Sequence, residues 1–125
     1  MVLVDTSVWV HHFRHRSESL ITLLSNDQVL CHPLILLEIA CGSPPAPRLK
    51  TLASIAKLQI AKTATTFEIM DLIESNDLYD SGCGAIDTSL LASTLITQEA
   101  KIWTKDKKLE ALAKKLGVCY KPSLH

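Results

Sequence analysis

The 125-residue sequence lacks the features that mark several protein classes. It has no surplus of positive charge, since 13 Lys and Arg balance 13 Asp and Glu, and this argues against a simple basic RNA-binding module. No apolar stretch reaches the roughly 20 residues needed to span a membrane. Asp5 interrupts the N-terminal apolar run too early for a signal peptide. We therefore expect a cytoplasmic protein with one domain over residues 1–125.

The sequence also lacks the spacing of a zinc site. Its four cysteines include no C-x-x-C pair, so we expect reduced, partly buried thiols. His11, His12 and His15 precede Cys31 and His32, but this spacing matches no standard zinc pattern. Adjacent histidines on a helix point about 100° apart. A surface role for these histidines is the favoured interpretation.

Short apolar runs alternate with helix-like segments along the whole chain. Strands that alternate with helices indicate right-handed βαβ units, and hence an α/β fold with a parallel sheet covered by helices. The segment 34–41 is apolar on every side, so we expect this helix to be buried all round. We predict strands over 1–4, 28–31, 58–61, 101–104 and 118–120, and helices over 7–13, 20–24, 33–41, 48–57, 67–73, 85–96 and 106–116.

Two acidic residues lie in segments that are otherwise free of charge. Glu38 is the only formally charged residue over positions 28–47, and Asp87 is the only one over 81–98. Burial of an ionised carboxylate costs several kcal/mol unless it is paired or binds a cation. No Arg or Lys lies nearby in the sequence. A distant side chain or a metal must therefore offset the cost.

Two further acids follow predicted strands. Asp5 comes directly after the first strand, and Asp106 lies just past the strand that ends at Thr104. Ligands of open parallel sheets bind beyond the carboxyl ends of the strands, so both acids should face one crevice, with Glu38 and Asp87 reaching it from helices. Clustered carboxylates suit Mg²⁺ or Mn²⁺. Such a site activates water and neutralises a phosphodiester, which is nuclease chemistry.

Each acid also has a structural interpretation. Asp5 and Asp106 are candidate helix caps, and Asp87 lies near a helix N-terminus, where the helix dipole favours negative charge. Glu38 has no capping role in mid-helix, so its alternative is a buried ion pair. The four acids together, in this order, make four independent structural roles the less favoured interpretation.

Four segments around these acids resemble, in order, the motifs of the PIN-domain family, and within it the VapC toxins of toxin–antitoxin pairs. They are LVDTSVW at 3–9, PLILLEIACG at 33–42, GAIDTSLLA at 84–92 and IWTKDKKL at 102–109. The resemblance implies a PIN-like three-layer α/β/α sandwich with a central parallel sheet. It also implies a homodimer and a cognate antitoxin that blocks the site.

By the same resemblance, Asp5, Glu38, Asp87 and Asp106 are the metal-binding and catalytic residues of an endoribonuclease that depends on Mg²⁺ or Mn²⁺. Such an enzyme, the toxin of a VapBC-type pair, hydrolyses RNA phosphodiesters. The fourth acid, Asp106, varies within the wider family. The alternative function is a non-catalytic PIN-like module that binds RNA or protein, and the presence of all four acids disfavours it.

Other polar residues lie close to the motifs. Ser7 and Thr104 are candidates to hydrogen-bond to Asp5 and Asp106 from outside the metal's own ligands, although ordinary turn polarity is their alternative. Trp9 and Trp103 are expected in the core. The candidate phosphate contacts are Arg14, Lys105 and Lys107, followed by Arg16 and Lys108, with a solvated helix face as the alternative for Lys107 and Lys108.

Overall fold

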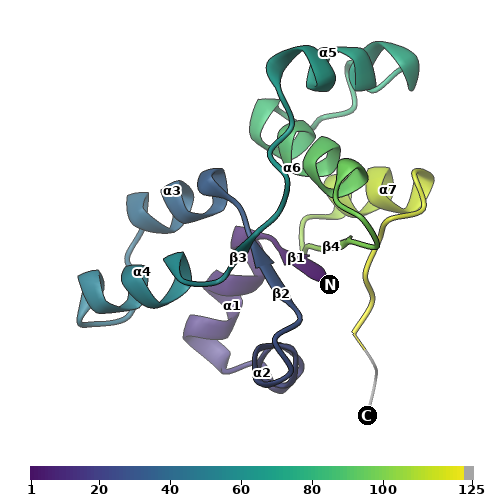
Figure 1. The fold of residues 1–125 in the computed structure, drawn as a ribbon. Helices are drawn as coiled ribbons and strands as arrows, with labels where there is room; N and C mark the ends of the chain where they lie inside the picture. Colours follow the sequence, from purple (N-terminus) through teal and green to yellow (C-terminus); the bar gives the residue numbers. More distant parts are fainter. Residues whose placement is uncertain (123–125) are drawn as a thin grey trace.

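A parallel four-stranded sheet forms the centre of the computed structural model, which describes residues 1–122 (Figure 1). The strands are β1 (Val2–Val4), β2 (Val29–Cys31), β3 (Gln59–Ile60) and β4 (Lys101–Trp103), and their order is β3-β2-β1-β4. Leu3 of β1 pairs with Leu30 on one side and Ile102 on the other. All three side chains are fully buried, as expected for strands covered on both faces.

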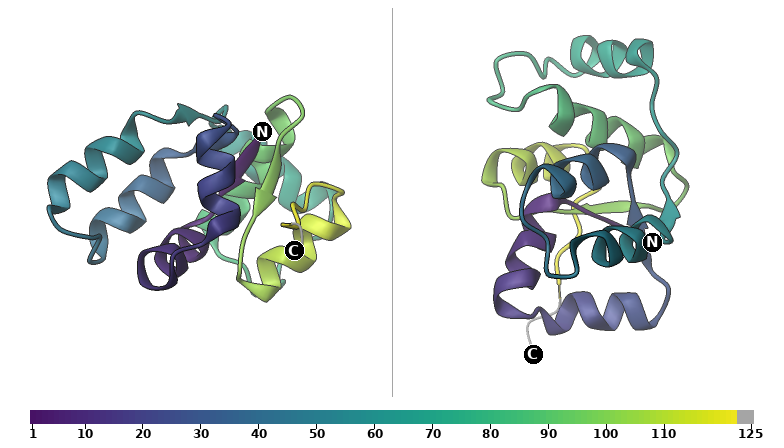
Figure 2. Two further views of the ribbon diagram at one scale, coloured as in Figure 1. Left: turned by 90° about the horizontal axis from the view of Figure 1, so that it is seen from below. Right: turned by 90° about the vertical axis from the view of Figure 1, so that its left-hand side faces the viewer.

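Seven helices cover the two faces of this sheet. The chain moves from β1 to β2 to β3 in one direction and then crosses back to β4, so right-handed crossovers place the early and late helices on opposite faces. Figures 1 and 2 show this division and confirm the predicted α/β/α sandwich. The early group is α1 (Thr6–His15), α2 (Glu18–Ser25), α3 (Pro33–Cys41) and α4 (Arg48–Ala56), and the late group is α5 (Thr66–Ser75), α6 (Ala85–Ile96) and α7 (Lys107–Lys115).

Local capping signals explain where several helices begin. Pro33 occupies the first turn of α3, and Gly42 follows its last residue. Thr65 and Glu68 form the predicted capping box of α5. The predicted helices and strands lie within about two residues of those observed, with the two exceptions below. No helix within residues 1–122 is long and apolar enough to cross a membrane.

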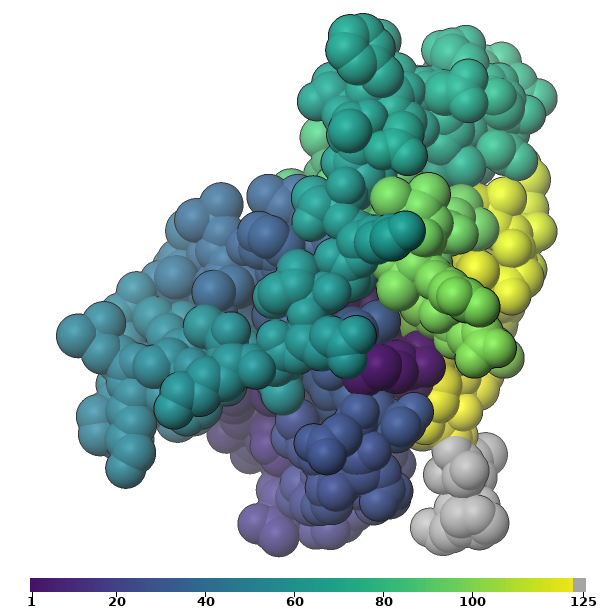
Figure 3. All heavy atoms as spheres, in the orientation of Figure 1, coloured from purple at the N-terminus to yellow at the C-terminus, as the bar shows by residue number. Residues whose placement is uncertain are grey.

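The prediction that the helix at 34–41 is buried all round is wrong. Ile35 and Ile39 of α3 pack into the core, but the side chain of Leu37 is 55% exposed. The physical reason is visible in the left view of Figure 2 and in Figure 3, where α3 and α4 project together from the body of the molecule. Only one side of α3 is therefore covered, and an apolar side remains accessible.

The predicted strand at 118–120 is reduced to a single parallel bridge between Cys119 and Ile102. The amide of Ile102 donates to the Val118 carbonyl and the amide of Tyr120 donates to the Ile102 carbonyl, both at 2.8 Å. These two bonds hold the segment after α7 beside β4, but the pairing does not extend far enough to form a regular strand.

A buried histidine connects helices of the two layers. The Nδ1 atom of His32 accepts the amide of Leu34 at 3.1 Å and so caps α3. Burial lowers the pKa of His32, and the neutral ring then carries its proton on Nε2. That atom donates to Ser93 Oγ on α6 at 3.0 Å, and the same oxygen accepts the amide of Ala64. His32 therefore links α3 to α6.

Candidate metal centre

Asp5 is the buried acid at the carboxyl end of β1, with only 5% of its surface exposed. Its Oδ2 atom accepts hydrogen bonds from Ser7 Oγ at 2.8 Å and from Thr104 Oγ1 at 2.7 Å. Although Asp5 occupies the position before α1, its side chain makes no capping hydrogen bond, so the capping interpretation of Asp5 is wrong. Within the described residues no hydrogen bond engages Oδ1, which leaves that oxygen for a ligand.

The two hydroxyl groups that donate to Asp5 are themselves oriented by backbone amides. Ser7 Oγ accepts the Lys105 amide at 2.9 Å, and Thr104 Oγ1 accepts the Asp106 amide at 3.0 Å. Each hydroxyl has one proton, and each gives it to Asp5. The 3.3 Å separation between the Ser7 and Thr104 oxygens is therefore a close contact without a shared proton. These bonds join the ends of β1 and β4, where the direction of the sheet crossovers reverses.

Asp106 caps the last helix with one of its oxygens. Its Oδ1 atom accepts the amide of Leu109 at 2.9 Å at the start of α7. The capping role weighed from the sequence is therefore present, but it occupies a single oxygen. Asp106 is exposed, and its negative charge raises the pKa of Asp87. Capping and a place in the acidic site are compatible at this position.

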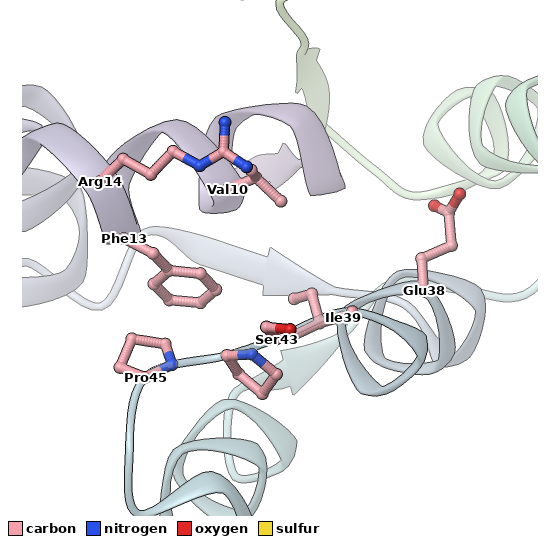
Figure 4. A pocket seen from close by; sticks show the side chains of 9 residues that line it. Val10, Phe13, Arg14, Glu38, Ile39, Ser43 and Pro45 are labelled. Atoms are coloured by element: carbon pink, nitrogen blue, oxygen red, sulfur yellow. The ribbon is translucent and has the colours of Figure 1, made fainter.

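Glu38 reaches the same region from the middle of α3. Its Oε1 atom accepts the hydroxyl of Thr6 at 2.8 Å, which joins α3 to α1. None of the salt bridges within residues 1–122 involves Glu38, so the structure gives no support to a core ion pair. Figure 4 shows the carboxylate extending from α3 away from Pro45. Sequence reasoning missed the role of Thr6, although this residue directly follows Asp5 in the first motif.

Asp87 connects the four acids electrostatically. It lies in the first turn of α6, and its pKa is raised from 3.8 to about 6. Burial is the largest cause, followed by the negative charges of Asp5, Asp106 and Glu38, and every one of these influences raises the pKa. Each of the other three carboxylates is therefore near enough to repel the negative charge of Asp87, and no cationic side chain is among the influences on its pKa.

The geometry is that of an open acidic cluster. Among residues 1–122, no group of three His, Cys, Asp or Glu side chains is placed so that it could hold a metal ion. Mg²⁺ binds through one or two carboxylates and keeps several of its waters, whereas a structural zinc site encloses the ion in four protein ligands. The oxygen donors and the unbalanced negative charge thus fit a hydrated Mg²⁺ or Mn²⁺ ion.

The half-buried thiol of Cys83, whose pKa is raised by burial and then by Asp87 and Asp106, borders the cluster and was not anticipated.

The predicted cationic residues differ in their surroundings, and Arg16 pairs with Glu18 at 3.0 Å instead of with the acidic cluster. Arg14 lines a pocket together with Glu38 (Figure 4). Lys105 is exposed between the Asp5 network and α7, and Lys107 is the exposed first residue of α7. Trp9 and Trp103 are 4% and 5% exposed, so both belong to the core as expected.

Comparison with known proteins places this geometry in a family. No protein-family model matches the chain. Two curated relatives are Ribonuclease VapC32 of Mycobacterium tuberculosis strain CDC 1551 / Oshkosh and of strain ATCC 25618 / H37Rv. Each is 39% identical over 118 residues, which cover 94% of this chain and 94% of the relative. The chain belongs to the VapC ribonuclease family. This membership confirms the PIN-domain resemblance and the expected toxin ribonuclease of the VapBC type.

Replacement of Asp87 by Asn tests the electrostatic description of the cluster. The folded-state pKa of Asp87 is raised, so its contribution to stability is complete below pH 3.8 and is lost as the pH rises through about 6. In EDTA, Asp87→Asn should therefore have a higher Tm than the wild type by a few degrees at about pH 7.5, and this gain should shrink at about pH 5. Thermal unfolding of both proteins measures the difference. An equal Tm difference at the two pH values would contradict the raised pKa of Asp87.

Proposed function

We propose that this VapC-family protein is a metal-dependent endoribonuclease whose Mg²⁺ or Mn²⁺ is held by Asp5, Glu38, Asp87 and Asp106. The observation that carries the proposal is the buried Asp5 carboxylate at the ends of β1 and β4, whose Oδ2 takes both hydroxyl hydrogen bonds while Oδ1 takes none within residues 1–122. The raised pKa of Asp87, to which the other three acids contribute, supports it. A cytoplasmic location accords with RNA as the substrate and with four cysteines that are free thiols.

Three of the four acids have hydrogen bonds that define their part in this proposal. The Ser7 and Thr104 hydroxyls occupy Oδ2 of Asp5, so Asp5 offers Oδ1 to the metal. The Thr6 hydroxyl orients Glu38, and Asp106 offers the oxygen that does not cap α7. When bound, the ion would lower the pKa of a water molecule and stabilise the negative charge that develops on the phosphoryl oxygens.

Replacement of Asp5 by Asn tests the metal site. The amide oxygen can still accept the Ser7 and Thr104 hydroxyls, so the fold should survive while the negative charge is removed. We expect RNA cleavage with Mg²⁺ or Mn²⁺ to fall at least about a hundredfold, and excess Mn²⁺ to raise the Tm of the wild type but not of the variant. Asp71→Asn, an exposed change on α5, is the control. If Asp5→Asn cleaves RNA at the wild-type rate, the protein is a non-catalytic PIN-like module or uses another mechanism.

We assign the antitoxin to the pocket between α1 and the end of α3, which has a volume of about 500 Å³. Figure 4 shows Phe13 of α1 opposite Pro45 of the following loop, with Val10 above and Glu38 at one end. An amphipathic antitoxin segment would place apolar side chains between the two helices. A basic side chain of that segment would then reach Glu38, and inhibition would result from charge as well as from occlusion.

Replacement of Val10 by Asp should weaken this interaction. Val10 is 36% exposed and lines the pocket, so a charge there disrupts the apolar contact without disturbing the core. We expect the protein encoded by the neighbouring small reading frame to bind at least about tenfold more weakly, which corresponds to about 1.4 kcal/mol. Binding is measured by calorimetry, and RNA cleavage without antitoxin serves as the activity check. Leu49→Asp on α4 is the control, and equal affinities of both variants would argue against this pocket.

We further propose that the homodimer forms through the apolar side of α5 and α6. Phe67 and Met70 of α5 are 84% and 59% exposed, and Leu95 and Ile96 of α6 are 38% and 37% exposed. These helices pack against each other, with Phe67 and Met70 in the first half of α5 and Leu95 and Ile96 at the end of α6. An exposed apolar surface of this kind marks an interaction site, and a two-fold axis would bury it against its own copy.

Replacement of Phe67 by Glu tests the dimer. The charge would be buried at the interface in two copies, so we expect the variant to become monomeric while the wild type remains dimeric. Light scattering coupled to size-exclusion chromatography gives the mass. Leu49→Glu places the same charge on an exposed leucine of α4 and should leave the dimer intact. A monomeric wild type, or a dimeric Phe67→Glu variant, would contradict the proposed interface.

A further inference from the structure

A second pocket, of about 610 Å³, lies between the end of β4 and the segment after α7. Its size falls within the range of small-ligand sites. Thr104 lines it, and the hydroxyl of Thr104 donates to Asp5 at 2.7 Å. Thr104 therefore connects the lining of the pocket to the Asp5 carboxylate, and a ligand in the pocket would lie one side chain away from Asp5.

Two aromatic rings line this pocket. The rings of Trp103 and Tyr120 are 5.5 Å apart between centroids, with their planes at 52°. Trp103 is nearly completely buried and supports Tyr120, which is partly exposed. The bond from the Tyr120 amide to the Ile102 carbonyl, at 2.8 Å, fixes the backbone that carries this ring. A supported, partly exposed aromatic ring is a surface on which a nucleobase stacks.

The charged residues of the pocket favour an anion. Lys105 and Lys121 line it with a single acid, Glu110. Lys121 and Lys114 both lie 3.3 Å from Glu110, so two lysines share one carboxylate and, with Lys105, positive charge is in excess here. Because the chain as a whole has no net charge, this local positive edge stands out against the acidic cluster next to it.

We infer that this pocket is a nucleotide subsite for the RNA substrate. A base stacks on Tyr120, its phosphate lies between Lys105 and Lys121, and the neighbouring phosphodiester is thereby brought over Asp5. The inference rests on the proposed ribonuclease function and adds to it the place where the nucleotide next to the scissile bond is held. A nucleotide suits the pocket because one ligand combines a flat ring with a negative charge, which matches the two kinds of side chain present.

RNA binding without cleavage tests the subsite. The probe is a short, unstructured RNA of mixed sequence with a fluorescein label, titrated in EDTA while its anisotropy is followed. Tyr120→Ala should raise the Kd roughly fivefold to a hundredfold, the range expected for one lost stacking interaction. Tyr120→Phe keeps the ring and should bind as the wild type does. Tyr79→Ala removes the other tyrosine of the chain, which is 59% exposed elsewhere, and should also have no effect.

A pair of lysine variants provides a second measurement that does not depend on the packing of Tyr120 against Trp103. Lys121 is 58% exposed, so Lys121→Gln should fold even if Tyr120→Ala does not. It should reduce the slope of log Kd against log salt concentration by about 0.7, whereas Lys50→Gln on α4 should not. An unchanged Kd in Tyr120→Ala, an equal loss in Tyr120→Phe, or an unchanged salt slope in Lys121→Gln would each overturn the subsite. Weakened binding of the antitoxin in place of RNA would overturn it in favour of a protein contact.

Kinetics separate the subsite from the ribonuclease function itself. With Mn²⁺ present, Tyr120→Ala should raise KM for the same RNA and leave kcat nearly unchanged, because the ring does not contact the reacting phosphate. If Tyr120→Ala cleaves RNA with the wild-type KM, the subsite is wrong and the ribonuclease function stands. A wild-type protein that binds RNA through Tyr120 but does not cleave it would remove the proposed function and leave the subsite.

Discussion

The carboxylate of Asp5 is buried at the point where the sheet reverses its direction of crossover, and much of the surrounding structure serves to keep it there. Parallel strands bring their carboxyl ends to one edge, so the residues after β1 and β4 must lie side by side. Ser7 and Thr104 satisfy one oxygen of Asp5 and are themselves held by backbone amides. A buried charge that is only half satisfied is costly, and a cation at the free oxygen is the natural way to offset that cost.

The cost of placing a carboxylate at this site also applies to the two helices that carry Glu38 and Asp87. These acids belong to opposite layers, and the negative charge of Glu38 is one of those that raise the pKa of Asp87. The bond from His32 at the start of α3 to Ser93 of α6 joins the two helices through neutral groups in the core. The cap that the same ring makes on α3 requires a neutral imidazole, because a protonated Nδ1 could no longer accept the Leu34 amide. The acidic cluster therefore lowers the stability of the fold, and the neutral hydrogen bond from His32 to Ser93 keeps α3 and α6 in place.

The sequence was sufficient to single out the four acids as candidates because Glu38 and Asp87 interrupt long uncharged segments and because Asp5 and Asp106 follow strands. Most helices were predictable from local signals such as Pro33. The exposure of Leu37 was not, because it depends on how far α3 and α4 project from the sheet. The bond from Thr6 to Glu38, 32 residues apart, arises only when α1 packs on α3. The pairing of Trp103 with Tyr120 likewise requires the segment after α7 to return beside β4.

Charge decides how such a protein can approach a polyanion. Four clustered carboxylates repel RNA, and a chain with no net charge cannot overcome this repulsion through long-range attraction. Binding must therefore come from cations beside the cluster and from the metal within it. Lys105 lies at this boundary, since its amide orients Ser7 and its side chain lines the aromatic pocket. A metal bound there, as proposed, would have two electrostatic roles: it would relieve the repulsion on Asp87, and it would convert a surface that repels phosphate into one that binds it.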